Sequence, residues 1–393
     1  MSGEEKKVTE EAVEATPEKE KKKKKKFLIF FLPFFIIFLV MVVGVAGFVG
    51  HKFSLINIDE ESTTIDPNQE FVEAEDDNLD FDEFDDATGN DFKAILKNWA
   101  LKEGEKINDK NVLNILLIGS DASASDPNRA NVTDKGNTDV MMLCSINPEK
   151  KTIKLVSFMR DSYTYLDKFD RYAKLNAACA NGGPGYLVET IENNYKIEID
   201  GYVMVDFDSF IHVIDVLGGV RVDVPVYIAN YFGKGFPSGN NVLLNGEQAL
   251  GFSRVRYTDA NGDVSRVARQ RQVITALIES CKGATLSEIN AVADVILANV
   301  RTNISRKAIF SYAAKAVTDG WPNFEISQLT MPTPDARYGY NSRSTAWIWV
   351  VDYPLCAQKL QLELYGKTNI KLEENRKTAI SVLGGYVSKK ATD

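Results

Sequence analysis

Arginines suited to binding a highly charged anion are concentrated in one short segment. Residues 251–272 read GFSRVRYTDANGDVSRVARQRQ and hold five arginines. Arg254 and Arg256 stand two residues apart in an apolar context that is typical of a strand, so their side chains are expected on one face. Asp263 or Ser265 is then expected to cap a helix that runs to about Cys281.

Three polar side chains share one face of this expected helix. Arg266, Arg269 and Gln270 are spaced three and four residues apart, and that spacing brings side chains together on a helix. An arginine in the first turn opposes the helix dipole, whereas a solvated face would carry acids there. Four guanidinium groups beside a helix N-terminus suit a pyrophosphate. A network of surface salt bridges is the alternative, although few acids lie nearby in the sequence.

The arginines need a scaffold, and three short apolar runs upstream predict one. Residues 112–118, 140–146 and 153–158 are expected as buried strands. Asp121 follows the first, Asp139 precedes the second and Arg160 follows the third. If the strands alternate in direction, these three side chains meet at one edge of a sheet, where α/β folds usually place ligands. Each residue taken singly is better explained as an ordinary loop or capping residue, whereas the three together with the arginines are not.

The rest of the chain alternates between helical and strand-like patterns. We expect helices at residues 183–195, 210–217, 245–250 and 355–364 and a mostly helical stretch at residues 287–317. Strands are expected at residues 201–207, 220–226 and 324–331, and a strand or turn at residues 347–352. This alternation predicts a three-layer α/β/α domain with a mixed central sheet over residues 111–366. Residues 367–393 are weakly patterned and are expected as a loosely structured tail.

The N-terminal segments predict a membrane anchor. Residues 1–26 are rich in Lys and Glu and are expected as a disordered cytoplasmic tail. Residues 27–50 are uncharged and mostly apolar, and a helix of that length spans a bilayer core of roughly 30 Å. The lysine run before this span puts the N-terminus in the cytoplasm, so that a signal anchor places the domain outside the cell. A cleaved signal peptide is the alternative.

An acidic segment separates the expected anchor from the expected domain. Residues 59–91 carry 15 acids and no base. We expect residues 51–110 to form an extracellular linker, a self-repelling spacer that holds the domain off an anionic surface.

The small number and the wide spacing of the cysteines and histidines argue against metal sites built from them and against a histidine-based catalytic site. The four cysteines are Cys144, Cys179, Cys281 and Cys356, and no two have metal-ligand spacing. Buried free thiols are therefore expected. Only two histidines occur, His51 and His212, which argues against a His-based nucleophilic triad or a His-rich zinc site.

The ordered set of motifs resembles the LytR-CpsA-Psr family of Gram-positive bacteria. The motifs are GSD at 119–121, TD at 138–139, SFMRD at 157–161, KLNAA at 174–178, DVLGGV at 215–220, RVR at 254–256 and DVSRVARQ at 263–270. The resemblance is strong over residues 111–282 and looser over residues 283–365. Two departures stand out: Asn137 replaces an arginine that the family usually has, and Met159 replaces a proline.

The resemblance implies a phosphotransferase that moves a glycopolymer from an undecaprenyl-pyrophosphate carrier to peptidoglycan, usually to the six-position hydroxyl of N-acetylmuramic acid. It implies that Asp121 and Asp139 hold Mg²⁺, or Mn²⁺ in its place, against the pyrophosphate. It also implies that the pyrophosphate is gripped by Arg160, Arg254, Arg256, Arg266, Arg269 and Gln270. Either Asp161 or Asp263 is a candidate general base on the acceptor hydroxyl.

A lipid carrier of this kind needs an apolar tunnel that ends at the arginines. Residues 203–210, 211–217 and 274–278 are apolar and flank the motifs, so they are candidates to line it. Ordinary core packing explains the same residues equally well.

Two other functions remain open. One is a Mg²⁺-dependent pyrophosphatase with water as the acceptor, and the other is a non-catalytic receptor or regulator that binds lipid-linked wall precursors. A nucleic-acid partner is not expected, because the arginines gather at one sheet edge and the domain is expected outside the cell. The expected partners are therefore the lipid-linked glycopolymer, peptidoglycan and the cytoplasmic membrane.

Overall fold

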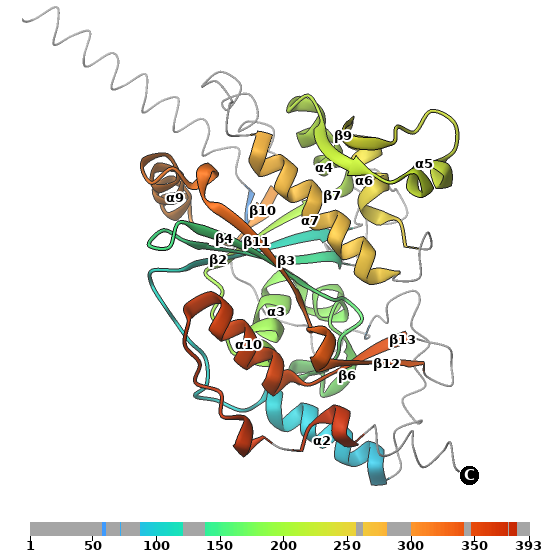
Figure 1. The fold of residues 1–393 in the computed structure, drawn as a ribbon. Helices are drawn as coiled ribbons and strands as arrows, with labels where there is room; N and C mark the ends of the chain where they lie inside the picture. Colours follow the sequence, from blue (N-terminus) through green and yellow to red (C-terminus); the bar gives the residue numbers. More distant parts are fainter. Residues whose placement is uncertain are drawn as a thin grey trace, which may run out of the picture. The chain divides into compact units, whose positions relative to one another are not determined.

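A seven-stranded mixed sheet forms the centre of the fold (Figure 1). The computed structural model describes residues 57–59, 71, 87–120, 138–256, 262–280, 300–341, 347–375 and 377–382, all within one unit, Leu55–Asp393. In spatial order the strands are β1 (Asn57–Ile58), β10 (Val300–Thr302), β7 (Gly201–Asp206), β2 (Leu113–Ser120), β3 (Thr138–Asn147), β4 (Thr152–Phe158) and β11 (Glu325–Met331).

The three strands predicted to alternate do so. β2 pairs antiparallel with β3, and β3 pairs antiparallel with β4. β7 adds to β2 in parallel, and β11 adds to β4 in parallel. The end of β2, the start of β3 and the end of β4 therefore lie at one edge of the sheet, and the predicted mixed sheet is confirmed.

Helices cover both faces of the sheet, which gives the predicted three layers (Figure 1). One face carries α2 (Ala87–Ala100), α3 (Ala177–Tyr195) and α10 (Tyr353–Tyr365); the other carries α4 (Phe207–Val216), α6 (Gly246–Arg254) and α7 (Asp263–Ser280). Aromatic rings join the layers below the sheet, because Tyr195 of α3 contacts both Phe158 and Tyr353, with ring centroids 4.7 and 5.5 Å away. The other α-helices in the described part of the chain are α5 (Val226–Phe232) and α9 (Arg306–Thr318).

Two of the segments with a strand pattern form separate hairpins and are not part of the main sheet. β8 (Val220–Val224) pairs with β9 (Gly239–Leu244), and β13 (Trp347–Val351) pairs with β12 (Arg337–Asn341). A third hairpin joins β5 (Tyr163–Leu166) to β6 (Arg171–Lys174). A local sequence pattern identifies a strand but not the strand with which it pairs. The pairing of these strands in hairpins could therefore not be predicted from the sequence. Short 3₁₀ helices complete the described part: η2 (Asp167–Phe169), η4 (Trp321–Asn323), η5 (Pro334–Ala336) and η6 (Leu372–Glu374).

The stretch expected to be mostly helical, residues 287–317, contains a strand. β10 lies within it and pairs antiparallel with β7. Three residues are too few to show an alternating pattern, which explains why the strand was not predicted. α9 is the helix of this stretch within the described residues, and residues 281–299 lie outside them.

The expected linker of residues 51–110 contains parts of the folded unit at both ends. β1 pairs in parallel with β10, and the Asp59 carboxylate accepts hydrogen bonds from Tyr202 and Arg301. In α2, Phe92, Leu96 and Trp99 are buried in the main core. Their spacing of four and three residues is helical, but the acids that precede them hid this signal.

The expected C-terminal tail is also partly folded. Ile370 and Ala379 are buried against the same core, so the folded unit extends beyond residue 366. The expected tail at residues 1–26 and the expected span at residues 27–50 lie outside the described residues. Among the helices that the structure describes, none is both long and apolar enough to cross a membrane.

Three of the four cysteines fall in the described part, and all three are free. Cys179 and Cys356 are buried and Cys144 is half-buried. Burial raises the pKa of the Cys179 thiol to about 11. These thiols therefore remain protonated and unreactive at neutral pH, as free structural cysteines do.

A buried lysine joins α2 to α3. Lys196 caps the C-terminus of α3 in a left-handed conformation (φ 53°) and is 1% exposed. Its ammonium group donates to the carbonyl oxygens of Trp99 and Lys102, at 2.9 and 2.5 Å. It also lies over the Trp99 ring, 5.0 Å from the centroid. Lys196 thus ties the end of α2 to the end of α3.

Replacing Lys196 with methionine should lower the free energy of unfolding by about 2 kcal/mol, because buried carbonyls lose their donor. Urea denaturation followed by circular dichroism measures this. Lys97→Met is the matched control, since Lys97 is on the surface of α2 and pairs with Asp170 in solvent, where ion pairs contribute little. Equal effects of the two substitutions would contradict a special role for Lys196.

Candidate functional site

Asp139 is the centre of a cluster of arginines at the predicted sheet edge. Its Oδ1 accepts a hydrogen bond from Nη1 of Arg160 at 2.6 Å and one from Nη2 of Arg256 at 3.3 Å. Nη1 of Arg266 lies 3.6 Å from the same oxygen. Three arginines therefore converge on the carboxylate of Asp139 in β3. They come from the segment after β4, from the segment after α6 and from α7. Asp121, expected beside it, lies outside the described residues.

Close packing between β2 and β3 sets the position of Asp139. Gly119 pairs with Val140, and a Cβ atom at Gly119 would lie only 2.9 Å from the Val140 Cβ. The register then shifts between Gly119 and Ser120, so that Ser120 pairs with Thr138. A larger residue at Gly119 would push the strands apart next to Asp139.

The predicted polar face of α7 points into this cluster. Arg266 is 1% exposed and pairs with Asp263 as well as Asp139. The amide of Gln270 lies 3.5 Å from the main-chain oxygen of Asp139. Arg269 donates to the main-chain oxygen of Val255, and this contact positions the neighbouring Arg256. The helical spacing therefore identified the correct face.

Arg254 differs from the expectation. It is the last residue of α6 rather than part of a strand, because the capping box of Asn245 and Gln248 starts a helix that continues one turn further than predicted. Its guanidinium is exposed and lies over the Phe207 ring, 4.4 Å from the centroid. The side chain of Arg254 consequently extends from the end of a helix, and that of Arg256 extends from the segment after this helix.

Two basic residues that the sequence analysis did not assign support the cluster. Lys174 lies 3.2 Å from Oδ1 of Asp161, which is also 3.6 Å from Nε of Arg160. Arg271 donates to the hydroxyls of Ser157 and Thr330, at 3.0 and 2.8 Å, and so ties α7 to β4 and β11. Lys174 was visible as the first residue of the KLNAA motif, whereas the partners of Arg271 depend on long-range packing.

The pKa values of Asp139 and Asp263 are shifted in opposite directions by burial and by the surrounding charges. Burial alone would raise the pKa of Asp139, but Arg266, Arg160 and Arg256 together hold it below its usual range. Burial raises the pKa of Asp263, and the opposing effect of Arg266 does not cancel this. Asp139 is therefore the more firmly ionised of the two.

An apolar cavity of about 300 Å³ begins at the cluster and runs between the sheet and the helices above it. Its apolar lining comes from strands β2, β3 and β7 and helices α4, α6 and α7, and includes Val203, Val205, Phe207, Phe210, Val213, Leu250, Val273, Ile274 and Leu277. Asp139, Arg254 and Gln270 also line it. The apolar runs predicted to flank a tunnel thus do line a cavity.

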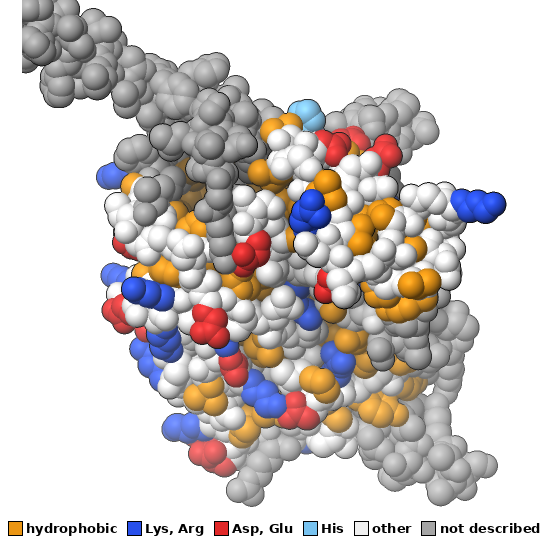
Figure 2. All heavy atoms as spheres, turned by 45° about the horizontal axis from the view of Figure 1, so that its top comes forward, with side chains coloured by type: hydrophobic (Ala, Val, Ile, Leu, Met, Phe, Trp, Pro, Cys, Tyr) orange, Lys and Arg blue, Asp and Glu red, His pale blue; other side chains and the backbone are white. Residues whose placement is uncertain are grey.

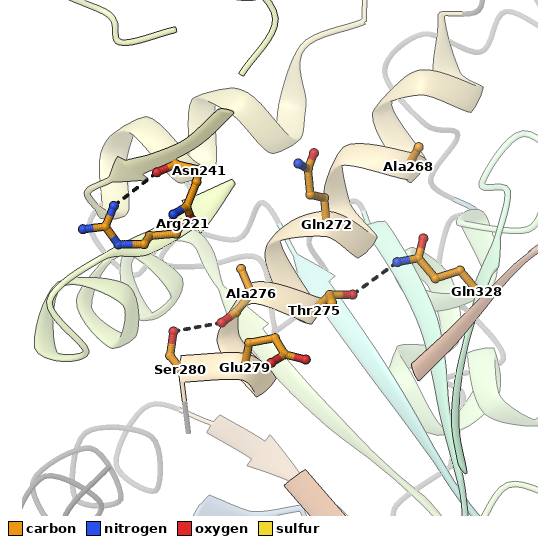
Figure 3. A pocket seen from close by; sticks show the side chains of 9 residues that line it. All are labelled: Arg221, Asn241, Ala268, Gln272, Thr275, Ala276, Glu279, Ser280 and Gln328. Carbon is orange, nitrogen blue, oxygen red and sulfur yellow. Dashed lines mark hydrogen bonds between the residues drawn. The ribbon is translucent and has the colours of Figure 1, made fainter. Parts of the chain in front are cut away.

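A second hollow lies on the other side of α7 and has a different chemistry (Figure 3). It measures about 670 Å³ and is lined by Arg221, Asn241, Ala268, Gln272, Thr275, Ala276, Glu279, Ser280 and Gln328. Gln328 donates to Thr275 at 3.2 Å across one side of it. This polar groove does not contain any residue of the arginine cluster among its described lining.

Asp139 suits one position of a Mg²⁺ site. Mg²⁺ commonly takes one or two carboxylates together with phosphate oxygens and water. The ion pairs of Asp139 with described residues all run to Oδ1. Within the described residues no three His, Cys, Asp or Glu side chains gather as a metal site, so the carboxylate of Asp139 would need phosphate oxygens or Asp121 beside it.

Solved structures share this fold. One titled "TagT bound to LIIa-WTA" superposes with a TM-score of 0.53 and 25% identity, covering 66% of this chain and 93% of that chain. The crystal structure of B. subtilis TagV gives a TM-score of 0.52 and 29% identity, covering 65% and 98%.

Curated relatives are similar in sequence. The chain is 35% identical over 213 residues to the polyisoprenyl-teichoic acid–peptidoglycan teichoic acid transferase TagU of Bacillus cereus, which is 53% of this chain and 65% of TagU. It is 33% identical over 264 residues to the corresponding transferase TagV of Bacillus subtilis (strain 168), which is 62% of this chain and 64% of TagV. The chain thus spans slightly less than two thirds of the length of these relatives. Residues 80–360 match the LytR_cpsA_psr family, and the chain therefore belongs to that family.

Proposed function

We propose that this protein is a phosphotransferase that moves a glycopolymer from an undecaprenyl-pyrophosphate carrier to peptidoglycan during cell-wall assembly. The observation that carries the proposal is the junction of the arginine cluster with the apolar cavity, which share Asp139 and Gln270. The first suits a pyrophosphate, and the second, at about 300 Å³, suits the isoprene units next to it. The names of TagU and TagV as teichoic acid transferases support the same substrate class.

The arginines would act on the phosphates. Arg160, Arg256 and Arg266 converge within 3.6 Å of one carboxylate oxygen, so a pyrophosphate beside Asp139 meets several donors at once. Phosphoryl transfer depends mainly on positioning and charge stabilisation. Donors fixed in advance by burial, as Arg266 is, stabilise the charge that develops in the transition state.

Asp263 is the better candidate for the general base. Burial holds its pKa above the usual range, and a raised pKa favours proton acceptance near neutral pH. Asp161 pairs with Lys174 and Arg160 and would position Arg160. In the proposed step the acceptor hydroxyl oxygen bonds to the phosphorus that carries the glycopolymer and its proton passes to Asp263. The bond from that phosphorus to the bridging oxygen breaks, and undecaprenyl phosphate leaves.

Asp139 and Asp121 would hold Mg²⁺, or Mn²⁺ in its place. The metal would neutralise charge on the phosphate oxygens when it is bound. Calorimetric titration of Mg²⁺ into the protein with and without a polyprenyl pyrophosphate tests this independently of turnover. Binding that is unaffected by replacing Asp139 would contradict the assignment.

The proposed location is the cell membrane, with one span at residues 27–50, the N-terminus in the cytoplasm and the catalytic domain outside, as in a Gram-positive envelope. The lysine run and the apolar segment support this orientation. A cysteine at Ser62 should react with a membrane-impermeant thiol reagent on intact cells, and labelling only after lysis would reverse the orientation.

The central test incubates the full chain in proteoliposomes with a lipid-linked glycopolymer and Mg²⁺, with and without peptidoglycan. Covalent transfer that requires peptidoglycan is the expected result. Release of phosphorylated glycopolymer into water at the same rate without an acceptor would instead identify a pyrophosphatase. Tight binding without any turnover would identify a receptor for wall precursors.

A further inference from the structure

An exposed aromatic surface covers one side of α5. We call it the α5 patch, and it consists of Val226, Tyr227, Tyr231 and Phe232, which are 64, 46, 58 and 38% exposed. Six of the ten large apolar side chains that are exposed in the described part of the chain lie between residues 216 and 243, so exposure of this kind is concentrated here. Hydrophobic side chains gather at the right of Figure 2, in the region where α5 lies.

The patch results from the composition of α5. Residues 224–233 read VPVYIANYFG and carry no charge. Ile228 and Ala229 are buried and pack the helix onto the domain, while Tyr227 and Tyr231, four residues apart, share the opposite side. A soluble surface would place charged residues at such positions, and an exposed apolar cluster of this kind marks an interaction site.

The α5 patch is attached to the wall of the apolar cavity. Phe232 packs against Gly251 of α6, where a Cβ atom would lie 3.1 Å from the ring. The neighbours of Gly251 along α6, Leu250 and Arg254, line the cavity. α6 is in turn packed on α4, because a Cβ atom at Gly246 would lie 2.3 Å from the main-chain oxygen of Ile211. The patch and the cavity are therefore two sides of one rigid group of helices.

We propose that the α5 patch inserts into the interface of the lipid bilayer, so that the chain of the lipid substrate passes from the membrane into the adjacent cavity. This inference rests on the proposed function for its substrate and on residues 27–50 as the anchor. The occupant is a phospholipid surface, with the aromatic side chains at the depth of the headgroups.

Composition and chain length favour a bilayer over a protein partner. Tyrosines are enriched at the membrane interface, and lysines beside them extend to the headgroups. Lys234 follows the patch closely. The charged residues between positions 216 and 245 are Arg221, Asp223 and Lys234, which give a net charge of +1.

The length of chain before β1 also favours a bilayer. Six residues separate Gly50 from Asn57 of β1, and an extended chain of that length bridges at most about 25 Å. The proposed anchor would thus keep β1 within this distance of the membrane surface.

The depth of residue 231 tests the proposal. The full chain carrying Tyr231→Cys is labelled with a bimane fluorophore and reconstituted in liposomes of phosphatidylcholine and phosphatidylglycerol. Leu362→Cys is the matched control, because Leu362 is an exposed apolar residue of α10, on the other face of the sheet. The unsubstituted chain reports any labelling of the native cysteines.

Lipids with a nitroxide on the acyl chain should quench the label at position 231 at least threefold more than the label at position 362, and aqueous iodide should give the reverse order. Equal quenching at both positions would overturn the proposal. Protection of position 231 from both quenchers, with cross-linking between copies, would also overturn it and would identify a self-association surface.

A second measurement separates docking from chemistry. The double variant Tyr227→Ser, Tyr231→Ser should reduce transfer from a long-chain substrate in liposomes about tenfold and leave transfer from a short-chain substrate in detergent unchanged. Equal loss in both assays would show that the patch supports the fold instead and would count against docking. The depth measurement requires no turnover, so quenching at position 231 in a protein without transferase activity would refute the proposed function and retain the docking surface.

Discussion

Replacing Asp139 with asparagine is expected to reduce glycopolymer transfer by about 10²- to 10³-fold, the range for removing one group that stabilises transition-state charge. Asparagine has nearly the same shape, so the packing between β2 and β3 should persist. The substitution removes the charge shared by Arg160, Arg256 and Arg266 and removes the proposed metal ligand. Initial rates of transfer in proteoliposomes measure the effect.

Asp335→Asn is the control for the Asp139 substitution. Asp335 is an exposed carboxylate of η5 that pairs with Lys359, so its replacement should leave the rate near that of the unsubstituted protein. If Asp139→Asn retained near-normal transfer with Mg²⁺, the arginine cluster would not be the reaction centre.

Filling the cavity should discriminate between long and short lipid substrates. Val203 lies on β7, a rigid strand, and lines the apolar cavity; it pairs with Leu117, two residues further from Asp139 than the pair of Val205 with Gly119. In Val203→Trp the indole ring should displace part of a bound polyprenyl chain beyond the isoprene units next to the pyrophosphate. Losing two or three buried methylene contacts costs about 2 kcal/mol, which weakens binding of an eleven-isoprene pyrophosphate about 30-fold. Binding of a two-isoprene pyrophosphate should change little.

Ala268→Trp is the matched control for the cavity substitution, because Ala268 is an exposed residue of the polar groove on the other side of α7. Fluorescence titration with the two pyrophosphates gives both affinities for each variant. Equal affinity of the unsubstituted protein for long and short pyrophosphates would exclude the cavity as the lipid site and leave a site for the headgroup alone.

The parts of the site that follow local patterns were predictable from the sequence. Apolar runs identified β2, β3 and β4, and spacing identified the inner face of α7 with Arg266 and Gln270. The alternation of the three strands then brought Asp139 and Arg160 together, 21 positions apart in sequence. The local sequence pattern was sufficient to predict this contact, because both residues lie at or next to the end of a strand.

Other parts depend on packing that no local pattern reveals. β10 is too short to show alternation, and its place beside β7 follows from tertiary pairing. Arg254 was expected on a strand, since two arginines with one apolar residue between them resemble one, yet helix α6 continues to that residue. The exposed aromatic residues of α5 resemble core residues in sequence, and only the structure separates their exposed side from the buried Ile228 and Ala229.

The pairing of β1 with β10 changes the meaning of the acidic segment that follows it. Asn57 and Ile58 are already in the sheet, and Asp59 is held by Tyr202 and Arg301. Phe71 packs against Phe169 of the same folded unit, and α2 begins at Ala87. The 15 acids of residues 59–91 therefore do not lie between the folded unit and the proposed anchor at residues 27–50, because both ends of the segment belong to the same body. Its length is a matter of loop closure, in which doubling the number of residues costs only about 0.6 kcal/mol. On the proposed topology, residues inserted there would leave the distance between the candidate site and the proposed anchor unchanged, whereas residues inserted between positions 50 and 57 would lengthen the connection to that anchor.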